Sequence, residues 1–145
     1  MDKVKLTVSG LLAVITARLG ILAMPVYILV FLNVSDYVTG IAAAYYKGEK
    51  VCSKTGFRGI AKKICMWLLI AIGVVVDKML VYTATVANIK ISLSFAVGCF
   101  VAIWLICNEV ISLLENINAI GVKVPRFLTD ILTKIKEKMK DNAQK

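Results

Sequence analysis

Three long apolar runs constrain the fold of this chain more than any other feature. They extend from about residue 19 to 46, from 64 to 87 and from 91 to 114. Each reaches the roughly 20 residues that an α-helix needs to cross the hydrocarbon core of a bilayer. None alternates as a β-strand would, and a membrane barrel would need many more such segments. The runs therefore predict an all-α membrane protein with about three transmembrane helices.

Composition supports the same class and argues against enzymatic chemistry. The 145 residues are 59% hydrophobic, whereas soluble domains are about 45–50% apolar. The sequence has no histidine, which is the commonest general acid or base and the commonest metal ligand. Its four cysteines form no CxxC pair of the kind found in zinc or redox sites. We expect a protein that is not an enzyme, with no cofactor, no metal and no nucleic-acid partner.

The chain divides into three parts, at residues 1–18, 19–121 and 122–145. The first part carries an apolar run of about a dozen residues, which is short for a span. This run is expected to form an interfacial helix or a helix packed on the bundle. Whether it crosses the membrane is left open. The second part holds the three transmembrane helices.

The third part is predicted to form a basic amphipathic helix. Pro125 stands where a helix can start. Apolar residues then recur at helical spacing with lysines on the opposite face, a pattern that favours contact with anionic lipid headgroups. The alternative is a solvated tail that only enforces topology. The apolar positions are Phe127, Leu128, Ile131, Leu132, Ile135 and Met139.

Charge outside the apolar runs predicts how the chain is oriented. The segment 47–63 holds six basic residues and one acidic residue. The tail after Gly121 holds seven basic and three acidic residues, whereas the turn 88–90 is nearly uncharged. Positive loops remain in the cytoplasm. With three spans in the bacterial inner membrane, the 47–63 segment and the C-terminus are therefore inside. The N-terminus is then outside, or inside if the first apolar run also crosses.

Ionisable residues within the spans are expensive, and each is treated as a functional candidate. Asp36, Thr39 and Gly40 share one helical face with Ala43, and Gly40 with Ala44 makes a small-xxx-small step that allows close helix packing. This face is expected to meet another helix, either in the same chain or in a second copy. It is the candidate surface for oligomerisation.

Two further polar features lie in the second and third spans. Asp77 is a candidate intramembrane group, with the alternative that it meets water at the outer end of the second span. A polar stripe follows at Asn108, Glu109, Ser112, Glu115 and Asn116, which covers about a third of a helix. Such a stripe faces protein, water or a pore rather than lipid. The alternative is ion pairing of its acids with Lys62 and Lys63.

The segment between the first two spans is predicted to be a loop with its own motif. Its glycines permit tight turns before the second span. It lacks the residue order of a phosphate-binding P-loop. The motif residues are Ser53, Lys54, Gly56, Gly59, Lys62 and Lys63.

Taken together, these pieces resemble the phage holin family that includes clostridial lysis holins and their toxin-release relatives. The resemblance covers roughly residues 30–126 and depends on the order and spacing of the pieces. It implies a protein that oligomerises in the bacterial inner membrane and opens a lesion, through which an endolysin or a toxin leaves the cytoplasm. The matching residues are Asp36 to Gly40, the loop motif, Asp77, the polar stripe, Gly121 and Pro125.

Two other classes of function compete with the holin. A small ion channel or transporter would carry ions along a fixed path, although a transporter usually shows internal repeats, and none is evident. A non-conducting scaffold subunit would leave membrane permeability unchanged. Length, composition and hydropathy fit all three classes equally.

Overall fold

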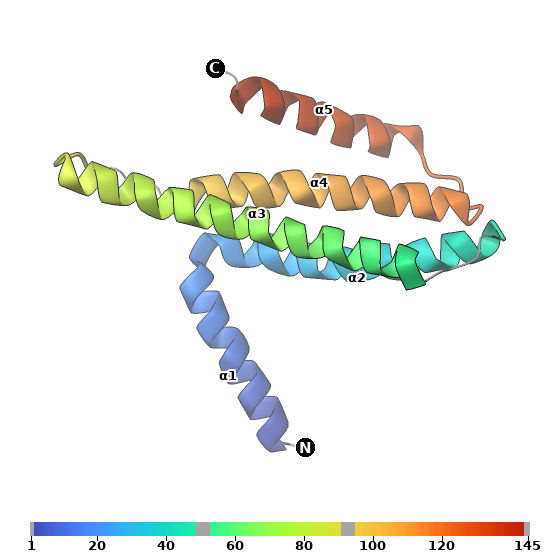
Figure 1. Ribbon diagram of the computed structural model, residues 1–145, viewed down its shortest axis with the longest axis horizontal. Coiled ribbons are helices and arrows are strands. Elements are labelled where there is room, and N and C mark those ends of the chain that lie inside the picture. Colours follow the sequence, from blue (N-terminus) through green and yellow to red (C-terminus); the bar gives the residue numbers. More distant parts are fainter. Residues whose placement is uncertain (1, 49–52, 91–94, 144–145) are drawn as a thin grey trace.

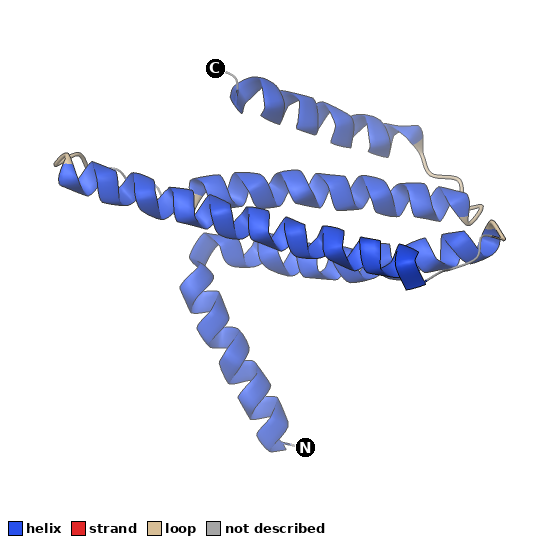
Figure 2. Ribbon diagram, viewed as in Figure 1, coloured by secondary structure: helices blue, strands red, loops and turns tan. Residues whose placement is uncertain are grey.

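The computed structural model describes residues 2–48, 53–90 and 95–143, and every regular element in these residues is a helix (Figure 2). Three helical stretches in this part of the chain are long and apolar enough to cross a membrane: Thr16–Tyr46, Gly56–Val86 and Ala96–Ala119. The predicted class, an all-α membrane protein with three candidate spans, is confirmed.

The helices form a bundle of three with one further helix at each end of the chain (Figure 1). In the bundle, α4 packs against both α2 and α3, so it is the central helix. The N-terminal α1 projects away from the bundle, and α5 returns beside α4. The elements are α1 (Asp2–Leu19), a 3-10 turn (Gly20–Leu22), α2 (Ala23–Tyr46), α3 (Ser53–Val86), α4 (Ala96–Ala119) and α5 (Arg126–Ala143).

The apolar core is thin, because few side chains face inward. It comprises Leu22, Leu29, Met66, Ile70, Ala102 and Leu105, from the turn before α2 and from all three bundle helices. Many large apolar side chains face outward instead, such as Phe31 at 69% and Leu68 at 57% exposed. In water such a surface would be a large aggregation liability. In a bilayer it is the surface that contacts lipid.

At the end near the α3–α4 connection, these two helices approach each other through glycine. A Cβ atom added to Gly73 would lie 3.0 Å from the Gly98 Cα atom, which is backbone and yields less readily than a flexible side chain. Small residues let transmembrane helices come this close and gain packing contacts that lipid cannot replace. Gly73 and Gly98 therefore fix the crossing point of α3 and α4.

The prediction of a loop between the first two spans is wrong for much of the segment. Helix α3 begins at Ser53, so Lys54, Gly56, Gly59, Lys62 and Lys63 lie in helix and not in loop. A glycine inside a helix costs only about 1 kcal/mol relative to alanine, which the long apolar run that follows readily offsets. The chain turns instead at Gly48, whose φ of +67° suits glycine.

The other helix boundaries differ less from the predicted ones. The third span was predicted from residue 91, but α4 begins at Ala96, after Phe95 in the left-handed region at φ +56°. Residues 91–94 lie outside the described part of the chain. The predicted N-terminal and tail helices are both present, as α1 and α5. Helix α5 begins at Arg126, directly after Pro125.

We predict that Gly73→Ala destabilises the α3–α4 pair. Its methyl group would press on Gly98 backbone, and overpacking of this kind costs about 1–3 kcal/mol. Gly59→Ala is the matched control, since an added Cβ there meets nothing within 4 Å in the same helix. Thermal unfolding of the purified protein in detergent measures both. Equal melting temperatures for the two variants would contradict the assigned crossing point.

Candidate functional site: an ionic network between three helices

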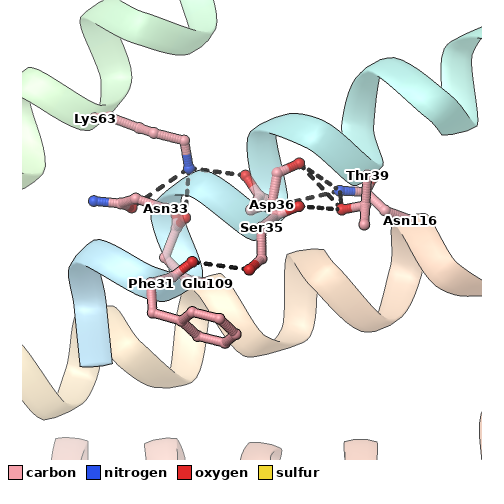
Figure 3. A network of polar contacts seen from close by, with 8 residues as sticks. All are labelled: Phe31, Asn33, Ser35, Asp36, Thr39, Lys63, Glu109 and Asn116. Carbon is pink, nitrogen blue, oxygen red and sulfur yellow. Dashed lines mark hydrogen bonds and ion pairs between the residues drawn. The ribbon is translucent and has the colours of Figure 1, made fainter. Parts of the chain in front are cut away.

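A single lysine joins all three bundle helices. The Lys63 Nζ atom on α3 donates to Asp36 Oδ2 on α2 at 2.9 Å and to Glu109 Oε2 on α4 at 2.5 Å (Figure 3). The Glu109 side chain is 1% exposed, and those of Lys63 and Asp36 are 17% and 15% exposed. A helix-bridging ion triad thus lies within the candidate spans.

The three charged residues lie at one level of the bundle. Asp36 is ten residues before the end of α2 at Tyr46, Glu109 is ten before the end of α4 at Ala119, and Lys63 is ten after the start of α3. Ten helical residues span about 15 Å. The triad therefore lies well inside the helices and not at these ends.

Asn33, one turn before Asp36 on α2, completes the buried polar cluster around the carboxylates. Flipping its side-chain amide, which exchanges the nitrogen and oxygen positions, places the nitrogen 2.9 Å from Glu109 Oε2 and the oxygen 3.2 Å from Trp67 Nε1. We adopt this orientation because the alternative offers only a 3.4 Å contact with Lys63 Nζ. Asn33 then donates to the carboxylate and gives the indole N–H of Trp67 an acceptor.

A second set of contacts joins α2 to the later part of α4. The Asn116 side-chain nitrogen donates to Asp36 Oδ1 at 3.0 Å and to Thr39 Oγ1 at 3.3 Å. Gly40 lies against this amide, because a Cβ there would be in ordinary van der Waals contact with Asn116 Nδ2 at 3.6 Å. Ala43, one turn further along, is buried and Ala44 is half-buried. The face predicted for helix packing thus contacts α4 of the same chain.

The predicted polar stripe of α4 divides into two groups. Glu109 and Asn116 point toward α2 and belong to the network. Asn108, Ser112 and Glu115 line a groove of about 290 Å³ between α3 and α4, with Lys62 on the opposite wall. Glu109 also reaches this groove, and Met66, Leu105 and Ile111 complete its lining. Of the two lysines considered as partners for the acids, Lys63 makes the ion pairs and Lys62 lines the groove. Glu115 and Lys62 are exposed, and Asn108 and Ser112 are half-buried.

Asp77 lies on the inner side of α3 and is only 3% exposed, so the alternative in which it simply meets water does not describe it. Its carboxylate accepts hydrogen bonds from the backbone N–H groups of Val97 at 2.9 Å and Gly98 at 2.8 Å. The first N–H groups of a helix have no partner within the helix. Asp77 therefore caps α4 from a neighbouring helix.

Sequence reasoning missed Asn33 and Trp67 as members of the network. A signal for Asn33 was present, because it precedes Asp36 by three residues and so lies on the same face of α2. Of the loop-motif residues, Gly56 lies near Tyr37, with an added Cβ 3.8 Å from its Oη atom. The side chains of Ser53 and Lys54 lie outside the described part. No cluster in the described residues could hold a metal ion.

The site and fold define an integral membrane protein whose spans are joined by buried ion pairs and whose extramembrane parts are small. A family model described as the bacteriophage holin family matches residues 13–137. The chain belongs to this family.

Its relatives cover nearly the same length. An uncharacterized protein of Listeria innocua is 35% identical over 97% of this chain and 92% of its own length. One from Clostridium perfringens strain 13 is 33% identical over 93% of this chain and 92% of its own length. A probable holin of Bacillus phage phi105 is 30% identical over 81% of this chain and 76% of its own length. No solved structure matches the chain significantly.

We predict that Lys63→Met is more destabilising than Lys62→Met. Removing Lys63 leaves two carboxylates without their cation, and breaking a buried pair costs about 3–5 kcal/mol. Removing Lys62 changes only the wall of a groove. The measurement is thermal unfolding in detergent micelles.

A double-mutant cycle with Glu109→Gln tests the pairing itself. The double variant Lys63→Met/Glu109→Gln should lose less stability than the sum of the losses in the two single variants, because neither charge is then left without its partner. Strict additivity would show that the two residues do not interact.

Proposed function

We propose that this protein is a holin. Copies assemble in the bacterial inner membrane and open a lesion through which an endolysin or a toxin leaves the cytoplasm. Membership of the bacteriophage holin family and the three candidate spans support this function. The protein acts without enzymatic chemistry, by displacing lipid.

The observation that carries the proposal is the polar groove between α3 and α4. Lys62, Asn108, Glu109, Ser112 and Glu115 line it together with the apolar residues Met66, Leu105 and Ile111, and it opens outward from a single chain. Polar groups at membrane depth face protein or water rather than lipid. A single copy in lipid leaves this groove without either. Assembly of several copies with the groove turned inward supplies water and gives the lesion a polar wall.

Assembly in this form keeps the ionic network intact. The Asp36/Gly40 face already contacts α4 of the same chain, so oligomerisation through that face would require α2 and α4 to separate. We therefore assign contacts between copies to the outward apolar faces of the helices. Van der Waals packing between such faces is the ordinary source of helix association in lipid.

Orientation follows from charge. The basic residues of the 47–63 segment, most of which lie in the first turns of α3, and the basic tail favour the cytoplasm for both regions and the outside for the residues around Asn88. The open end of the groove near Lys62 and Glu115 then lies toward the cytoplasm, where the cargo is. The basic tail then faces the inner leaflet, whose anionic headgroups attract its lysines.

Induction of the protein alone in a bacterial host tests the proposal. Membrane potential should collapse, and a cytoplasmic reporter enzyme should then appear in the medium. Loss of potential without release of the enzyme would identify a small channel. Unchanged permeability at full membrane expression would identify a scaffold, and either result would overturn the holin assignment.

The wall of the lesion is tested by Glu115→Gln. Removing this groove carboxylate should lower the preference for cations over anions, because fixed charge along a water path selects its counter-ions. Ser112→Ala is the matched control, since it changes the wall of the same groove without removing a charge. Reversal potentials across planar bilayers measure the preference. An equal change in both variants would show that the Glu115 charge does not face the path.

A further inference from the structure

Helix α5 packs against α4 with the flank of its apolar face and not with its centre. The side chains of Leu132, Lys136 and Met139 are half-buried, and the Lys136 Nζ atom lies 5.3 Å from the centre of the Trp104 ring. A cation over an indole ring is a favourable contact. The face that meets α4 thus includes a lysine.

The centre of the apolar face of α5 stays exposed to a large extent among the residues that the structure describes. Phe127, Leu128, Ile131 and Ile135 form a stripe on one side of the helix, and they are 60%, 37%, 50% and 41% exposed. We call these four residues the α5 stripe. Its borders are basic: by helical spacing Lys134 and Lys138 lie along one edge and Lys136 along the other.

The position beside α4 conflicts with a lipid surround. Trp104 lies in the first half of α4, well inside the span that ends at Ala119. With α5 alongside, Lys134 and Lys138 stay exposed at the level of the hydrocarbon. Charged side chains there are costly unless water reaches them. The α4-packed position therefore requires water beside α4.

We propose that α5 has a second position, flat on the anionic inner leaflet, with the α5 stripe buried among the headgroups and Lys134 and Lys138 on lipid phosphates. A stripe of this length between basic edges fits an interfacial helix. The two positions exclude each other, since α5 runs along α4 in one and across the membrane plane in the other. Gly121, at φ +104°, and the non-helical residues up to Pro125 form the pivot.

This inference rests on the proposed function and gives it a switch. Before assembly α5 lies on the leaflet. When copies surround a water-filled lesion, α5 turns to α4 and carries its lysines into the water path, with Lys136 on Trp104. The partner recognised in the first state is an anionic lipid surface.

The test uses the full-length protein, with its native cysteines replaced, in vesicles at low protein density. An environment-sensitive fluorophore on Ile135→Cys should report an apolar setting in vesicles rich in phosphatidylglycerol and an exposed one in phosphatidylcholine. The same fluorophore on Glu137→Cys, which lies on the polar face of α5, should report a water-exposed setting in both kinds of vesicle. Lys134→Gln and Lys138→Gln should each lower the leaflet-bound fraction relative to the free fraction about fivefold.

The same signal in both lipids would overturn the inference, as would a signal that rises with protein density, which would identify a second copy as the partner. Because no lesion is needed, this result is separate from the induction experiment. Leaflet docking without enzyme release would contradict the holin assignment alone. Release without docking would contradict only the switch.

Discussion

The contact of Lys63 with Asp36 and Glu109 is the interaction on which the rest of the structure depends. Lipid offers no solvation for these groups, so each charge within the bundle needs a partner from another helix. Lys63 supplies one cation to two acids on two helices. Neither α2 nor α4 can turn about its axis without exposing a carboxylate to hydrocarbon. The triad therefore sets the rotation of all three helices at its level of the bundle.

The opposite end of the bundle is held by packing and by a helix cap. Gly73 and Gly98 bring α3 and α4 into backbone contact, and Asp77 satisfies the first N–H groups of α4. With both ends fixed, Asn108, Ser112 and Glu115 are held away from α2 and toward the groove. The polar surface that supports the lesion proposal is thus a consequence of the contacts that fold the single chain.

The sequence predicted the elements of the fold because hydropathy and helical periodicity are properties of single segments. Three apolar runs and an amphipathic tail were found in this way. The start of α3 was missed because Gly56 and Gly59 were interpreted as turn residues, although a long apolar helix tolerates both. The partners of Asp36 and Asp77 were missed for a different reason. They lie on other helices, so they depend on how helices rotate against each other, which no single segment determines.

The polar stripe shows the same limit within one helix. Spacing predicted that Glu109, Ser112 and Glu115 avoid lipid. All three line the groove, but Glu109 also accepts the Lys63 ion pair, which the other two do not. Which part of the stripe is structural and which faces water depends on the position of α2. The candidate surface at Asp36 and Gly40 was likewise correct as a packing face, and the structure supplies its partner from the same chain.

The most direct test of this account is disulfide trapping between α2 and α4. In a variant without native cysteines, Gly40→Cys and Asn116→Cys place one thiol on each of two facing positions, where a Cβ at Gly40 would lie 3.6 Å from Asn116 Nδ2. Oxidation in intact membranes before lysis should join them within one chain, so that the protein runs as a monomer on a denaturing gel under non-reducing conditions. Cross-linking mainly into dimers would contradict the account, because the Asp36/Gly40 face would then contact a second copy.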